Sequence, residues 1–168
     1  MVKAKRKFLR GKEARKLLLE FLRQTKLDPK FLSELKPPIE LANTDHERIY
    51  FVEKEPILIE SNGRIFPSLT AFKILSNMPQ IIVNMGAIAP ICNGADVMAP
   101  GIVKYEKDFN EGDFVVVLDE QHRKPIAITL SLYNTKKAKQ FKSGKILKNI
   151  HHVGDKLWNT LKHLSRRL

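Results

Sequence analysis

The apolar positions of this chain change their spacing along its length, and the spacing predicts which elements form. Between residues 11 and 25 apolar side chains recur every third or fourth position, with charged residues on the other faces, which indicates an amphipathic helix. Short apolar runs at 39–41, 49–52 and 57–59 then favour a small antiparallel sheet. Asn62 and Gly63 predict a two-residue hairpin, because both central positions of a type I′ turn require positive φ.

The second half of the chain is dominated by short strands. A helix is predicted from Pro67 to about Asn77, and another over 86–93, which Gly94 ends in the C-cap role. Strand segments are predicted at 81–83, 97–98, 102–105, 114–118, 126–132 and 146–150, and Gly, Pro, Asn or Asp lies in the turns between most of them. Closely spaced strands of this kind favour a small barrel or rolled sheet. A basic tail, Lys162 to Arg167, is expected to be helical or loosely ordered.

These elements predict an α+β protein with two domains. We place a small amino-terminal domain at residues 1–78, a barrel domain at 79–158 and a basic tail at 159–168. The break near residues 78–84 is tight, so the two halves are expected to pack on each other.

Charge is distributed unevenly along the sequence. The net charge is +12, but residues 1–30 hold eleven Lys and Arg against three acids (+8). Residues 136–168 hold ten Lys and Arg against one acid, Asp155 (+9), and the middle of the chain gives −5. A basic surface formed by both ends would suit a polyanion. The alternative is a solvated face that keeps the protein soluble, with ion pairs of the kind found in heat-adapted proteins.

Signatures of catalysis are missing from the sequence. It contains no glycine-rich phosphate loop, no HExxH and no GxSxG, and the lone Cys92 cannot form an intramolecular disulfide or a cysteine-rich metal cluster. We therefore expect no enzyme activity, cofactor or metal. The first residues carry cations without the apolar core of a leader peptide, and no apolar run is long enough to span a bilayer, so a cytoplasmic location is expected.

Two groups of titratable residues are candidates for catalysis or metal binding. His151 and His152 are adjacent, and in a strand they would point to opposite faces. Five acids fall in or beside predicted turns, where Asp is common for turn-forming reasons: Asp108, Glu111, Asp113, Asp119 and Glu120. Neither group predicts a catalytic pair.

The glycines and lysines of the second half favour a protein that binds RNA over an enzyme. Glycines near positions 86, 94 and 101 would let an RNA backbone approach main-chain amides. Eight lysines flank the barrel strands and can reach phosphates: Lys104, Lys107, Lys136, Lys137, Lys139, Lys142, Lys145 and Lys148. Phe109, Phe114 and Trp158 fall in apolar patterns and are expected in the core, so backbone and shape reading is favoured over base stacking.

One segment carries a recognisable pattern: GAIAPICNGADVMAPGIVKYEKDFNEGDFVVVLDEQHRKPIAI, closing with SGKILKNIHHVGDKLW. It resembles the PUA domain, an RNA-binding pseudobarrel, over about residues 79–158. The first half, with KFLRGKEARKLL and FPSLTAFKILSNMPQIIVNMGAI, resembles the pre-PUA domain of archaeal proteins related to the malignant T-cell-amplified translation factor.

This resemblance implies non-catalytic RNA binding in translation, with tRNA or small-subunit rRNA as ligand and the small ribosomal subunit, or a separate translation factor, as partner. Neither DNA nor membrane is implied. The groove residues carried over are Gly86, Ala87, Gly94, Ala95, Asp96, Val97, Met98, Pro100, Gly101, Lys104, Lys145, Lys148 and His151. Ala99 stands where the pattern commonly has a basic residue, which removes one expected phosphate contact.

Two alternatives remain open at this point. The chain could be an accessory subunit that supplies RNA affinity to a separate modification enzyme. It could also be a protein-interaction adaptor whose acidic middle docks a basic partner through Glu47, Glu53, Glu55 and Glu60.

Overall fold

The computed structural model describes residues 4–35 and 38–165 and divides the chain into two compact units. The first comprises the chain up to Leu75 together with the segment from Thr160, and the second runs from Ser76 to Asn159. Helix α5 (Lys156–Ser165) therefore begins in the second unit and ends in the first. The expected basic tail lies partly in this helix, whose Leu161 and Leu164 are buried.

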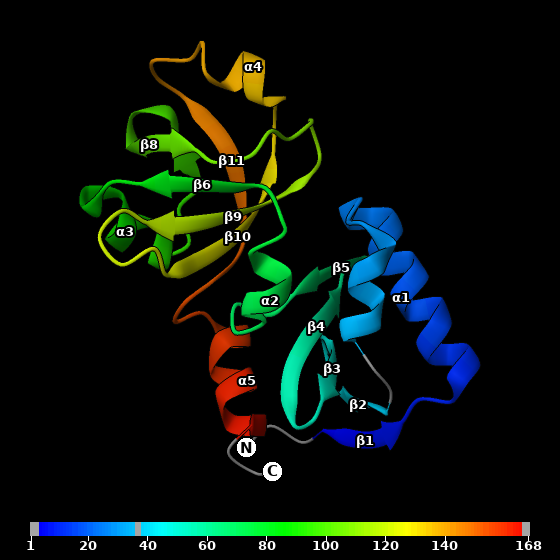
Figure 1. The fold of residues 1–168 in the computed structure, drawn as a ribbon. Coiled ribbons are helices and arrows are strands. Elements are labelled where there is room, and N and C mark those ends of the chain that lie inside the picture. The colour runs from blue at the N-terminus through cyan, green and yellow to red at the C-terminus, as the bar shows by residue number, and fades with distance from the viewer. Residues whose placement is uncertain (1–3, 36–37, 166–168) are drawn as a thin grey trace. The chain divides into compact units, whose positions relative to one another are not determined.

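The first unit is built on a five-stranded antiparallel sheet in chain order (Figure 1). The strands are β1 (Lys5–Phe8), β2 (Ile39–Asn43), β3 (Arg48–Val52), β4 (Glu55–Ser61) and β5 (Arg64–Pro67). Helix α1 (Gly11–Thr25) buries the predicted apolar face, and the 3-10 segment η1 (Pro29–Glu34) and helix α2 (Phe72–Leu75) complete the unit. Arg6 of β1 donates to the carbonyl of Leu164 at 3.0 Å, so described parts of both basic ends meet here.

The hairpin and the first helix confirm the sequence pattern. Helix α1 has the bounds that its apolar spacing predicts. Asn62 and Gly63 have φ values of 51° and 73°, as a type I′ turn requires. The last turn of α1 also protects the open edge of β5, because the Gln24 side chain accepts from the Ile65 N–H at 2.8 Å and donates to the Gly63 carbonyl at 3.3 Å.

The helix expected from Pro67 to Asn77 is wrong in its extent. Pro67 ends β5, where it pairs with Leu58, and the Ser68 N–H donates to the carbonyl of Ile57 at 2.9 Å. These bonds keep the chain extended past Pro67, so α2 occupies only Phe72–Leu75. Pairing with the sheet has overridden the local preference for proline at a helix start.

The second unit is a curled six-stranded sheet in the order β7-β11-β10-β9-β6-β8 (Figure 1). Its elements are β6 (Gln80–Val83), α3 (Met85–Cys92), β7 (Val97–Met98), the 3-10 turn η2 (Ala99–Gly101), β8 (Ile102–Tyr105), β9 (Phe114–Asp119), β10 (Pro125–Ser131), α4 (Thr135–Ala138) and β11 (Lys145–His152). The edge strands β7 and β8 are joined directly by η2, which brings the two edges together. This is the rolled sheet that the sequence predicts.

The second unit has an apolar core of buried side chains. Ile81, Val83, Val115 and Val117 from β6 and β9 lie at its centre and are fully buried. Phe109 is also buried, which confirms its expected place in the core. None of the helices in the described ranges is long and apolar enough to cross a membrane.

Candidate nucleic-acid interface

A pocket with a volume of about 300 Å³ lies between α3 and η2 in the second unit. Its lining residues are Asn84, Gly86, Ala87, Pro90, Ile91, Asp96, Met98, Pro100 and Gly101. Six of these were predicted as groove residues from the sequence, so the structure brings a large part of the predicted set into one hollow. We call this hollow the α3 groove.

Asn84 fixes the two walls of the α3 groove relative to each other. Its Oδ1 accepts from the Ala87 N–H at 3.0 Å, which caps α3. Its Nδ2 donates to the carbonyl of Pro100 at 3.3 Å, and its backbone N–H donates to that of Gly101 at 2.9 Å. Asn84 was not among the predicted site residues, although an Asn directly before a helical segment is a recognisable N-cap signal.

Small residues set the width of the groove. A Cβ built on Gly101 would lie 3.0 Å from the Ala87 Cβ, closer than nearly all real contacts of this kind. Gly101 does not have positive φ, so its constraint is steric and not conformational, contrary to what its turn position suggests. Gly94 does have positive φ, at 92°, and turns the chain out of α3.

Replacing Gly101 by valine should push η2 away from α3 and distort the groove. We expect weaker RNA binding and a loss of stability of about 1–3 kcal/mol, the usual cost of overpacking. Urea unfolding measures the loss of stability, and an RNA titration measures the loss of binding. Gly112→Ala would be a poor control, because Gly112 has positive φ and a side chain there strains the backbone. Gly11→Ala is suitable, since nothing lies within 4 Å of a Cβ there. Native-like stability and binding of the valine variant would contradict the steric reading.

Asp96 is the one ionisable side chain among the described residues that line the groove. Its Oδ2 lies 2.6 Å from the Lys145 Nζ, and its Oδ1 accepts from the Asn149 N–H at 2.7 Å. Partial burial raises the pKa of the Asp96 carboxyl, but the bonds from Lys145 and Asn149 outweigh it and hold the pKa below its usual value. An ionised carboxylate in the wall disfavours a phosphate inside the groove and suits an uncharged hydrogen-bond donor, such as a base amino group or a ribose hydroxyl.

The three predicted lysines are not part of the groove lining, and they differ in availability. Lys145 is paired with Asp96, and Lys104 lies 3.0 Å from Glu106, which also binds Arg123 at 2.8 Å. Lys148 is exposed and makes no ion pair within the described part of the chain. Of the three predicted lysines, Lys148 is therefore the one most accessible to a phosphate.

Two predicted groove residues lie in the interior. Val97 is 1% exposed and His151 is 0% exposed, so neither side chain can contact a ligand on the surface. The Nδ1 of His151 is 2.8 Å from the Asp155 Oδ2, which ties the end of β11 to the start of α5. Their inclusion in the predicted site is corrected, because alternation in β7 and β11 turns these positions toward the core. His152, the neighbour, is partly exposed.

Two of the five acids considered above, Asp113 and Asp119, stabilise turns. Asp119 is 5% exposed and accepts from the backbone N–H groups of Gln121, His122 and Lys124 at 3.0, 2.6 and 2.9 Å. Asp113 accepts from the Asn110 N–H at 2.8 Å. The three backbone N–H bonds to Asp119 lower the pKa of its carboxyl, although its burial has the opposite effect.

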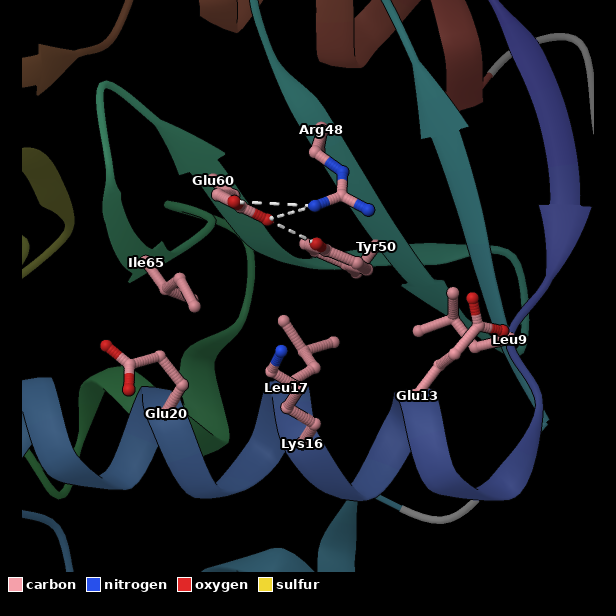
Figure 2. Close-up of a pocket in the computed structure, with 9 residues that line it drawn as sticks. All are labelled: Leu9, Glu13, Lys16, Leu17, Glu20, Arg48, Tyr50, Glu60 and Ile65. Atoms are coloured by element: carbon pink, nitrogen blue, oxygen red, sulfur yellow. Dashed lines mark hydrogen bonds and ion pairs between the residues drawn. The ribbon is translucent and has the colours of Figure 1, made fainter.

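A second pocket, of about 350 Å³, lies in the first unit between α1 and the sheet (Figure 2). Glu60 in its wall accepts from Tyr50 at 2.5 Å and from Arg48 at 3.1 Å. Burial, followed by the bond to Glu60, raises the pKa of the Tyr50 hydroxyl. The carboxylates on α1 are engaged too, since Glu13 binds Lys7 at 3.0 Å and Glu20 binds Arg23 at 2.6 Å. These carboxylates are already neutralised within the unit, which favours a structural role.

Two models of known protein families match the two halves of the chain. The PUA domain model matches residues 79–153, and the model of a domain of unknown function, DUF1947, matches residues 5–73. An uncharacterized protein of Methanocaldococcus jannaschii is 41% identical over 92% of this chain and 96% of its own length. Translation machinery-associated protein 20 of Saccharomyces cerevisiae is 30% identical over 74% of this chain and 73% of its own.

A solved structure gives the same result for the fold. The crystal structure of a PUA domain from Aeropyrum pernix K1 superposes with a TM-score of 0.86 at 28% identity, covering 98% of this chain and 94% of that one. The resemblance stated from the sequence is confirmed. The chain belongs to the family of PUA-domain proteins that includes translation machinery-associated protein 20.

Proposed function

We propose that this protein binds RNA in translation without catalysing a reaction, and that the α3 groove is the main contact. A nucleoside enters the groove, where Asp96 accepts from a base or ribose donor, and the adjoining phosphates lie at Lys145 and Lys148. One observation carries this proposal. Among the described residues that line the groove, Asp96 is the one ionisable group, and Lys145 lies directly beside it outside the lining. The family and the net charge of +12 support it.

The RNA is a tRNA or the rRNA of the small ribosomal subunit. This part of the proposal rests on the kinship with translation machinery-associated protein 20. The corresponding partners in this proposal are the small ribosomal subunit and a separate translation factor, and the corresponding location is the cytoplasm.

Binding to purified tRNA and to small ribosomal subunits should be measured across a salt series. Affinity should fall steeply with salt, because each phosphate contact contributes about 0.7 to 0.9 to the slope of log affinity against log salt. Single-stranded DNA of the same sequence as an RNA probe should bind more weakly, since it lacks the 2′-hydroxyl. Absence of binding to either RNA at low salt would overturn the proposal.

Pull-downs with and without nuclease separate this function from its alternatives. Retention of ribosomal proteins only while RNA is intact supports RNA-dependent association. An adaptor would keep its partners after the RNA is destroyed, and an accessory subunit would be recovered with a modification enzyme instead of ribosomes.

A further inference from the structure

Helix α4 and the turn that follows it lie at one end of β10 and β11 (Figure 1). This segment carries four lysines. Their exposed side chains belong to Lys136, Lys137, Lys139 and Lys142, which we call the α4 ridge. The chain from residue 121 to 154 contains eight Lys and Arg and no Asp or Glu. An acid-free stretch of this length is an electrostatic feature in its own right.

The α4 ridge is held rigidly by the residues beneath it. Thr135 is 3% exposed, and its Oγ1 accepts from the Phe109 N–H at 2.7 Å, while Ala138 is fully buried. Asn134 caps the helix by accepting from the Lys137 N–H at 2.8 Å. The backbone of a helix anchored in this way loses little conformational entropy when a ligand binds to its side chains.

Two of the ridge ammonium groups lie over aromatic rings instead of beside carboxylates. The Lys137 Nζ is 4.8 Å from the centroid of Tyr133, and the Lys139 Nζ is 5.6 Å from that of Tyr105. Tyr133 in turn stacks on Phe141 with centroids 4.6 Å apart. A ring positions an ammonium without neutralising its charge, whereas Lys104 and Lys145 are paired with Glu106 and Asp96.

The ridge adjoins the α3 groove through the backbone. The Ala99 N–H, in η2, donates to the carbonyl of Gly144 at 2.9 Å, just after the ridge. Tyr105, under Lys139, ends the strand that follows η2. Beside the ridge lies a polar pocket of about 450 Å³, whose lining includes Asn110, Asn134, Lys136 and Lys139 and the carboxylate of Asp108.

We propose that the α4 ridge is a second RNA contact, which binds the phosphodiester backbone of the strand where it continues past η2 from the α3 groove. The inference rests on the proposed function and adds a site to it. The groove takes a nucleoside, and the ridge adds affinity only for an RNA long enough to reach both.

The test compares Lys136→Gln/Lys139→Gln with a control that removes the same charge elsewhere, Lys54→Gln/Lys73→Gln in the first unit. The probes are labelled oligouridylates of about four and about sixteen nucleotides, the range of small single-strand sites, and unfractionated tRNA. The ridge variant should bind the long probe and tRNA more weakly, and its salt slope on the long probe should fall by about 1.4, two single-strand contacts. Binding of the short probe should not change.

Several outcomes would overturn the ridge site while leaving the proposed function standing. These are unchanged binding of the long probe and tRNA by the ridge variant, an equal loss with the control variant, or an equal loss on the short probe. Loss of binding to phosphatidylserine vesicles with RNA affinity unchanged would assign the ridge to a membrane surface. Failure of the unaltered protein to bind any of the RNAs would instead contradict the proposed function. Thermal melting of both variants confirms that the fold is retained.

Discussion

Removing both cations, Lys145→Gln with Lys148→Gln, should weaken RNA binding by roughly 10- to 30-fold near physiological salt and lower the salt slope by about 1.4 to 1.8. The reason is the loss of two phosphate contacts beside the α3 groove. Fluorescence anisotropy with labelled tRNA at several salt concentrations measures both quantities. The thermal stability should change little, because both side chains are exposed.

The two lysines should not contribute equally. Lys145→Gln leaves the Asp96 carboxylate in the groove wall without the ammonium now 2.6 Å away, so it adds a repulsive charge to the lost contact. Adding Asp96→Asn to Lys145→Gln should therefore recover part of the affinity. If the double variant binds as weakly as Lys145→Gln alone, Asp96 does not face the bound RNA. Wild-type affinity in the variant that lacks both lysines would place the interface elsewhere.

Asp155→Ala should lower the free energy of unfolding by about 1–3 kcal/mol, because the buried His151 ring and the first turn of α5 lose the acceptor that they share. The carboxylate accepts from the buried His151 ring at 2.8 Å, from the His152 N–H at 3.0 Å and from the Trp158 N–H at 2.6 Å, where it caps α5. Trp158 is the single tryptophan of the chain and lies beside the change, so its fluorescence during urea unfolding is a direct readout.

The Asp155 carboxylate makes the stability of the wild-type protein depend on pH, and Asp155→Ala should remove that dependence. Burial raises the pKa of Asp155, but the bond and charge of His151 and the backbone donors outweigh it, and the pKa lies below its usual value. A carboxylate whose pKa is lower in the folded protein stabilises the fold at any pH above its unfolded-state pKa, which is about 3.9 for Asp. This stabilisation is lost as the pH falls through the lower pKa of the folded state. Asp155→Ala should therefore lose less stability than the wild type below about pH 4. Asp155→Asn, which keeps an acceptor for the α5 cap, is the milder control; equal stability of all three proteins would contradict this role.

Local signals predicted the elements whose residues act on their immediate neighbours. The apolar stripe of α1, the Asn62-Gly63 turn and the Gly94 helix end depend on spacing and on φ, and the structure confirms all three. Strand β1 gave no such signal, because Lys5–Phe8 is mostly charged and is held by pairing with β2, far along the chain. The late start of α2 has the same cause, a bond from Ser68 to a neighbouring strand.

The sequence predicted some features of the candidate site, and the fold decided the others. The sequence by itself determined the family, the segment that supplies most of the groove lining and the basic character of the chain, because motif order and composition are properties of the sequence that do not depend on tertiary contacts. Only the tertiary structure decided which side chains reach a ligand. Burial removed Val97 and His151, and a contact across 49 positions paired Lys145 with Asp96. Asn84 became the residue that joins α3 to η2 because folding brought Pro100 and Gly101 to its side chain and backbone.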